Sequence, residues 1–245
     1  MKITFDGKKA LVTGATQGIG RGIALALAEN GAKVVALGRN EDLLRSLKAE
    51  NSSIEVVKCD VTADEKTIRD ALAPFQPFDM LVNNAGIAVV KSFLDLSLDD
   101  IDAMLSVNVK GAMVVAQIVA KEMVAHQIKG SIVHLSSQAS AKPLLGHAVY
   151  CASKAALDML GRVMALELGQ YGIRINCVNP TVVLTEMGKQ VWSDPAKAQP
   201  LLDKMPIKRF AEVDDVVKAV MFLLSDCAAM TTGAVFPVDG GYMAV

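Results

Sequence analysis

Short apolar runs rich in β-branched residues alternate with longer helical patterns from one end of the chain to the other. Several of these runs are continuously apolar, as is typical of strands that are covered on both faces in a parallel sheet. Such an alternation predicts an α/β fold with a doubly wound, mostly parallel sheet and helices on both faces. The expected strands are residues 9–13, 33–37, 54–58, 80–84, 131–136, 173–178 and 234–238.

The 245 residues contain no internal repeat, low-complexity tract or linker, which indicates one domain over residues 1–245. No uncharged apolar run approaches the roughly 20 residues of a membrane-spanning helix, and the N-terminal residues lack the layout of a signal peptide. We therefore expect a soluble, cytoplasmic protein without direct membrane insertion. Membrane association through partners stays open.

The charge and the cysteines argue against two further classes of function. A net charge of −1 disfavours a nucleic-acid partner, because phosphate binding needs a basic surplus or patch. The four cysteines are far apart and form no CxxC pair. We therefore expect reduced thiols and no metal site.

Two helical segments, 111–125 and 152–168, are apolar in nearly every direction around the axis. A helix that covers a sheet needs only one apolar stripe. Packing against a second copy of the chain, most simply across a two-fold axis, explains the second apolar face. Burial by other parts of the same chain is the alternative.

A glycine-rich turn, LVTGATQGIGRG (11–22), follows the first expected strand and leads into a helix. Gly14 can make a tight bend, Gly18 lets a pyrophosphate approach the backbone, and Gly20 lets the helix pack closely on the sheet. The free N–H groups of the helix N-terminus then favour phosphates. This placement predicts a dinucleotide site, although glycine clusters also mark plain turns.

The ends of the next strands bear on which dinucleotide binds. An Asp or Glu after the second strand would repel a 2′-phosphate, but VVALGRN (34–40) has no carboxylate at the strand end. Arg39 can bind a 2′-phosphate in bidentate fashion, which favours NADP(H); a solvated surface arginine is the alternative. Asp60 ends the third strand near the expected adenine. Asn83 ends the fourth strand and is expected to line the cofactor site; a strand-capping residue is the alternative.

Tyr150 and Lys154 are one turn apart on an expected helix, so both project from the same face. A free phenol has a pKa of about 10, and a nearby ammonium should lower that pKa toward the operating range. Tyr150 could then exchange a proton with a carbonyl oxygen, and Lys154 could also bind the nicotinamide ribose. A core tyrosine beside a snorkelling lysine is the alternative.

Ser136 and Ser137 follow the fifth strand, at another carboxyl end of the expected sheet. A serine hydroxyl there can bind a substrate carbonyl and stabilise its developing charge. A serine nucleophile is disfavoured because no GxSxG turn surrounds either residue. Asn108, on the preceding helix, could hold a water that relays protons to Lys154.

Together, TGATQGIG, NNAG, SVN, the serine and YCASK resemble the short-chain dehydrogenase/reductase family over essentially the whole chain. The resemblance implies a seven-stranded Rossmann sheet, hydride transfer at a nicotinamide, a substrate lid over about residues 181–210, and a catalytic tetrad of Asn108, Ser137, Tyr150 and Lys154. The full set of expected cofactor residues is Gly14, Thr16, Gln17, Gly18, Ile19, Gly20, Arg39, Asp60, Val61, Asn83, Ala85, Gly86, Tyr150, Lys154, Pro180, Val183 and Thr185.

Longer stretches, among them NPTVVLTEMG, VWSDPAKA and FAEVDDVV, are similar to the dicarbonyl/L-xylulose reductases. This similarity implies a substrate pocket that includes His147. A plain loop histidine is the alternative for this residue. Two positions depart from the pattern. Gln17 stands where NADP-preferring relatives often have a basic residue, and Gly146 replaces an expected polar residue, which affects the substrate range. The implied pocket residues are Ser137, Gln138, His147, Tyr150 and Trp192.

The implied activity is NADPH-dependent reduction of L-xylulose to xylitol, of other short sugars and of small α-dicarbonyls. The protein is expected to be a homo-oligomer, and a tetramer is favoured over a dimer. A 3-ketoacyl or steroid carbonyl reductase on the same scaffold is one alternative, although no basic patch for an acidic acyl carrier is visible. An NADP(H)-binding sensor or scaffold without turnover is another. The intact Ser/Tyr/Lys set argues against it.

Overall fold

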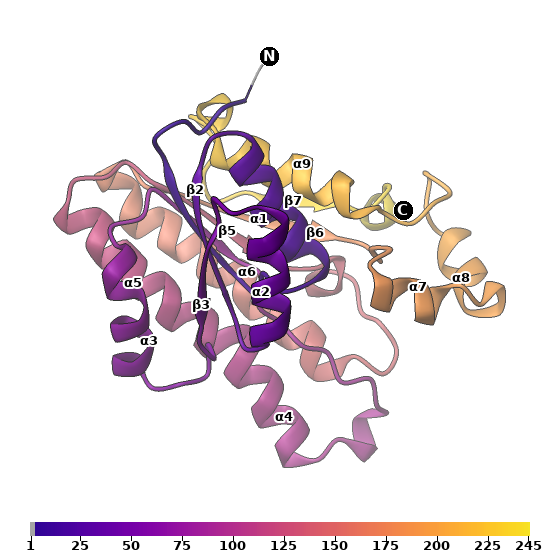
Figure 1. Ribbon diagram of the computed structural model, residues 1–245. Coiled ribbons are helices and arrows are strands. Elements are labelled where there is room, and N and C mark those ends of the chain that lie inside the picture. The colour runs from indigo at the N-terminus through magenta and orange to yellow at the C-terminus, as the bar shows by residue number, and fades with distance from the viewer. Residues whose placement is uncertain (1–2) are drawn as a thin grey trace.

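A seven-stranded sheet, in which every paired strand is parallel, runs through the protein (Figure 1). The computed structural model describes residues 3–245, apart from the side chains of residues 187, 190, 191 and 197. All of the expected strands are present, with ends that differ by at most two residues. They are β1 (Lys9–Thr13), β2 (Lys33–Gly38), β3 (Glu55–Lys58), β4 (Met80–Asn83), β5 (Ser131–Leu135), β6 (Arg174–Pro180) and β7 (Val235–Val238).

The strand order β3-β2-β1-β4-β5-β6-β7 reverses its direction beside β1. The chain moves outward from β1 to β3 and then crosses back to β4 on the other side of β1. Ligands of doubly wound sheets bind at such a switch point, outside the carboxyl ends of the strands. The order therefore places the glycine-rich turn after β1 and the end of β4 at one cleft.

Helices cover both faces because the strand side chains alternate in direction. Ala10 and Val12 belong to one core cluster, together with side chains of α1 (Gly18–Glu29), α2 (Glu41–Glu50) and α9 (Val213–Leu224). Leu11 belongs to the opposite cluster, which also contains side chains of three further helices. Figure 1 shows these helices on the other side of the sheet from α1 and α2. These are α3 (Glu65–Leu72), α5 (Ala112–Ala125) and α6 (Ala148–Leu168).

Two smaller helices, α7 (Glu186–Trp192) and α8 (Pro195–Leu202), lie to one side of the sheet (Figure 1). They share a separate small core with Met205, Phe210 and Tyr242. Proline at the first position and a capping Asp194 start α8, as its sequence indicates. The short helical turns are Ala73–Phe75, Phe93–Asp95, Gln138–Ser140, Gly169–Tyr171, Asp226–Ala228 and Tyr242–Ala244.

One long helix is formed by α4 (Leu98–Leu105), a π-helical segment (Ser106–Gly111) and α5. Among the described residues, this stretch, Leu98–Ala125, has the length and mean hydropathy of a membrane-spanning helix. Half of its most apolar part is buried inside the structure, where Val115 and Val119 pack under the sheet. It is therefore a core helix.

Candidate active site

Two adjoining cavities lie at the carboxyl ends of the strands. The larger has a volume of about 1010 Å³ and extends from the glycine-rich turn and the end of β2 to Tyr150 and Lys154. The smaller has a volume of about 440 Å³ and is lined partly by α7 and α8. Tyr150 lines both cavities. A group bound in the larger cavity and a small molecule in the smaller one would therefore meet at this phenol.

The glycine-rich turn has the backbone that a dinucleotide requires. Gly14 and Gly18 adopt positive φ angles of 63° and 54°, which favour glycine. A Cβ on Gly14 would lie 2.8 Å from Cα of Ala85, and one on Gly20 would lie 2.3 Å from the carbonyl oxygen of Gly14. The Gln17 side chain does not cap α1, so the first N–H groups of this helix stay open to an anion. The residues present thus fit a pyrophosphate.

Arg39 lies at the far end of the larger cavity, where its Nη1 is 3.5 Å from Oδ2 of Asp60. The side chain is 67% exposed, so it is free to reorient toward a phosphate. Burial acts to raise the pKa of Asp60, but hydrogen bonds from Thr62 and the charge of Arg39 outweigh it and hold this pKa below its usual value. The expected cofactor residues Arg39 and Asp60 therefore form an ion pair with each other.

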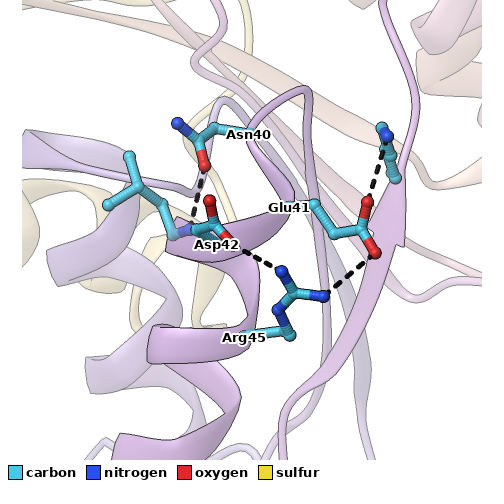
Figure 2. A network of polar contacts seen from close by, with 6 residues as sticks. Asn40, Glu41, Asp42 and Arg45 are labelled. Carbon is cyan, nitrogen blue, oxygen red and sulfur yellow. Dashed lines mark hydrogen bonds and ion pairs between the residues drawn. The ribbon is translucent and has the colours of Figure 1, made fainter.

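Two carboxylates in the first turn of α2 follow Arg39 in the sequence, and both have other partners (Figure 2). Asp42 and Glu41 pair with Arg45, and Glu41 also lies 3.0 Å from Nζ of Lys58. Because these negative charges are compensated locally, they oppose a phosphate beside Arg39 less than free carboxylates would.

All of the expected cofactor residues line the larger cavity except Asn83 and Val183. Asn83 points into the core, where its Nδ2 donates to the Ala112 carbonyl at 2.9 Å. Alternation along β4 instead directs Asn84 toward the glycine-rich turn, where it donates to the carbonyls of Thr13 and Gly14 at 3.0 Å. Val183 forms a β-bridge with Ala211 and packs against the core. These two residues do not line the larger cavity, and a contact of either with the cofactor stays a prediction.

Tyr150 and Lys154 lie close together on α6, as their spacing predicts. Nζ of Lys154 is 5.7 Å from the centroid of the phenol ring and donates to the Leu135 carbonyl at 2.7 Å. The lysine is only 4% exposed. Ser137, after the end of β5, lines the smaller cavity together with Tyr150. Three of the four expected catalytic residues thus surround the junction of the cavities.

The direction of the pKa shift at Tyr150 differs from the expected one. Burial raises the pKa of the phenol, and the neighbouring Ser137 hydroxyl opposes this only in part. Burial also lowers the pKa of Lys154 to about 8, against the charge of Asp158. Desolvation of the phenol therefore outweighs the attraction of the ammonium, and Tyr150 stays protonated near neutral pH, as a proton donor must be.

Asn108 is fully buried in the π-helical segment and lines neither cavity. Its Nδ2 donates to the Ile87 carbonyl at 2.9 Å and to Oγ of Ser153 at 3.0 Å. It lies near Lys154 all the same, because a Cβ on Gly86 would be 3.4 Å from Oδ1 of Asn108 and 3.5 Å from Nζ of Lys154. A water relay between the two residues stays a prediction.

The expected substrate residues all line the smaller cavity: Ser137, Gln138, His147, Tyr150 and Trp192. The rings of His147 and Tyr150 are edge to face with centroids 6.0 Å apart. Trp192 packs on Phe210 at 5.5 Å, which fixes the indole at the cavity wall. Polar groups therefore cluster near the phenol, and the aromatic wall comes from α7.

Comparison with known proteins identifies the family. A family model described as Enoyl-(Acyl carrier protein) reductase matches residues 14–243. L-xylulose reductase of Caenorhabditis elegans is 54% identical over 97% of this chain and 96% of its own. A solved structure named short chain dehydrogenase/reductase family protein is 36% identical, with a TM-score of 0.90, over 98% of this chain and 99% of its own. The chain belongs to the short-chain dehydrogenase/reductase family. It is therefore an oxidoreductase.

A further solved relative carries a cofactor. Gluconate 5-dehydrogenase of Burkholderia cenocepacia, in complex with NADP and tartrate, is 33% identical to this short-chain dehydrogenase/reductase. The TM-score is 0.92, with 99% of this chain and 97% of that one covered. The similarity extends over both cavities, because it covers nearly the whole chain.

Several cavity residues of this short-chain dehydrogenase/reductase were not expected from its sequence. Asn84 lines the larger cavity in place of its expected neighbour Asn83, and only the direction of the side chain separates the two. Thr181, Lys204 and Tyr242 line the smaller cavity, although they come from three segments that are far apart in the sequence. No local pattern marks them. Asp158, which lines neither cavity, did carry a signal, since it follows Lys154 by four residues and repeats the spacing of Tyr150 and Lys154.

Proposed function

We propose that this oxidoreductase uses NADPH to reduce the carbonyl groups of short sugars, with L-xylulose converted to xylitol, and of small α-dicarbonyls. The position of Tyr150 at the junction of the two cavities carries this proposal. The L-xylulose reductase relative and the NADP-bound relative support it. A cavity of about 440 Å³ with polar groups at one end suits a five-carbon sugar.

The chain's residues have distinct roles in this reaction. The glycine-rich turn and Arg39 would hold NADPH along the larger cavity, where it would supply the hydride. Tyr150 donates a proton to the carbonyl oxygen, while the Ser137 hydroxyl holds that oxygen and stabilises its developing charge. Lys154 binds the nicotinamide ribose and favours the phenolate that forms. Asn108 positions a water that returns a proton toward Lys154.

We assign residues 1–245 to one NADP-binding domain. Substrate selection rests on the smaller cavity of this domain. Gln138 and His147 bind sugar hydroxyls, and Trp192 covers the apolar edge of the substrate. We assign the lid to about residues 181–210. The separate small core of α7 and α8, and the position of Lys204 on the cavity wall, support a segment that moves as a unit.

We assign the protein to the cytoplasm. Its assembly is a homo-oligomer, for which a tetramer is favoured and a dimer is possible. Support comes from the outer face of α6, where Met159, Val163 and Leu166 are 55%, 42% and 84% exposed. Met113 of the neighbouring α5 is 46% exposed. Contiguous exposed apolar side chains of this kind mark surfaces that bind protein.

Replacing the proton donor tests the function. Tyr150→Phe removes only the hydroxyl, so kcat/KM for L-xylulose and for diacetyl should fall at least about 100-fold. NADPH binding, measured by fluorescence, should survive, and wild-type turnover should be faster with NADPH than with NADH. Tyr171→Phe is the matched control, because Tyr171 is exposed outside both cavities. Near-normal activity of Tyr150→Phe would refute the proton-donor role, and an inactive wild type would refute the proposed substrates.

A further inference from the structure

The helix that carries Tyr150 and Lys154 holds a third titratable side chain in line with them. Asp158 follows Lys154 by four residues, so the phenol, the ammonium and the carboxylate lie on one face of α6. Asp158 is only 9% exposed. A buried carboxylate is costly unless it is paired and hydrogen-bonded, so its place beside the reaction centre needs a reason.

The contacts of Asp158 lead back to the reaction centre. Its Oδ2 accepts a hydrogen bond of 2.9 Å from Nδ2 of Asn179, on β6. The same Nδ2 lies 3.0 Å from the carbonyl oxygen of Ser137 and 2.9 Å from Oγ of Ser140. Asn179 therefore holds both the carboxylate and the backbone of the serine that lines the substrate cavity. Oδ1 of Asp158 has no hydrogen-bond partner among the described residues.

The other groups that face Lys154 do not supply a negative charge. From its own helix come Tyr150 and Asp158, and from β5 comes His134, whose pKa is lowered by burial to about 4. From β6 comes Cys177, whose pKa is raised by burial and by Asp158, so it stays a neutral thiol. At neutral pH the phenol and the imidazole are neutral as well. Asp158 is thus the negative charge within this group.

We propose that Asp158 is a positioning residue of the reductase: held by Asn179, its buried carboxylate is the counter-charge that keeps the Lys154 ammonium protonated in the catalytic cleft. This inference rests on the proposed function, in which the ammonium acts on the phenol and on the ribose. The burial that lowers the pKa of Lys154 to about 8 leaves little margin above neutrality, and the charge of Asp158 acts in the opposite direction. Without it, the lysine would lose its proton within the physiological range.

The pH dependence of the Asp158→Asn variant tests the proposal. The substitution keeps the shape and the acceptor for Asn179 but removes the charge. The alkaline limb of kcat/KM should move to lower pH by at least about one unit, so that activity above the limb falls about tenfold. The pH at which NADPH affinity weakens, measured by fluorescence titration, should shift in the same direction. Asp158→Glu should stay close to the wild type in both profiles.

Asp239→Asn is the matched control, because Asp239 is also buried but accepts hydrogen bonds from backbone N–H groups near the C-terminus. It should leave the alkaline limb in place. A uniform loss of activity in Asp158→Asn, with both profiles unshifted, would overturn the proposal in favour of a structural role. The proposal would also be overturned if the Asp158→Glu variant folded while the Asp158→Asn and Asp158→Gln variants did not. The NADPH titration does not depend on the substrate, so it separates failure of this inference from failure of the proposed reaction.

Discussion

Single buried polar residues near the reaction centre are held in one protonation state by their surroundings. His134 of β5 is fully buried, its Nδ1 lies 3.3 Å from Nδ2 of Asn83, and its Nε2 has no partner among the described residues. Burial, and then the charge of Lys154, lower the pKa of this imidazole to about 4. A second positive charge beside Lys154 is thereby avoided at neutral pH.

This depressed pKa makes a prediction for acid stability. The unfolded chain takes up a proton on His134 near pH 6.5, whereas the folded chain does so only near 4, so stability falls as the pH falls through this window. The loss amounts to about 3 kcal/mol. His134→Leu should therefore lose about that much less stability than the wild type between pH 7 and pH 4, as measured by urea unfolding. His126→Leu, at an exposed position, is the control. Equal losses in wild type and His134→Leu would contradict the prediction.

At the scale of elements, the reaction centre depends on how closely α6 packs on β6. Gly161, in the middle of α6, faces Cys177 of β6, and a Cβ on Gly161 would lie 2.7 Å from the cysteine sulfur. Glycine inside a helix usually costs stability relative to alanine, by about 0.5–1 kcal/mol. At this position the close approach of helix and strand outweighs that cost.

Gly161→Ala should accordingly destabilise the protein, by about 1–3 kcal/mol, because the added methyl group overpacks the contact. The measurement is the free energy of unfolding in urea. Gly169→Ala, where a Cβ would meet nothing within 4 Å, should be close to neutral. The double variant Gly161→Ala/Cys177→Ala should recover part of the loss. A stabilised Gly161→Ala would show that the contact does not limit the packing.

At the scale of the whole molecule, the apolar surface of α5 and α6 is larger than the sheet needs. The buried face of α6 packs on β6 and carries Lys154, while its outer face exposes Met159 and Leu166. One helix thus has a catalytic face and a face available to a second subunit. Association would hold α6 from both sides.

Leu166→Glu should weaken this association. The new carboxylate would have to be buried in an apolar interface, so light scattering after size-exclusion chromatography should show a smaller assembly than for the wild type. Leu166→Met, which keeps an apolar side chain at the same position, should retain the wild-type mass. An unchanged mass for Leu166→Glu would place the interface elsewhere, and a monomeric wild type would remove it altogether.

The properties that the sequence determined by itself are those set by local geometry. Apolar runs of the right length defined the seven strands, because strands buried on both faces need continuous apolar side chains. The turn at Gly14 and the pairing of Tyr150 with Lys154 were equally readable. Backbone freedom and the periodicity of a helix depend only on near neighbours in the chain.

Tertiary structure decided the properties that depend on what surrounds a residue. Asn83 and Asn84 are chemically identical, and only the direction of each side chain at the end of β4 sends one to the core and the other to the cleft. The pKa of Tyr150 rises where the sequence suggested a fall, because burial of the phenol is the largest influence on it. Asp158 acquires its place only through Asn179, which is distant in sequence. Direction, burial and long-range contact all require the packed fold, since they are set by segments that meet only after folding.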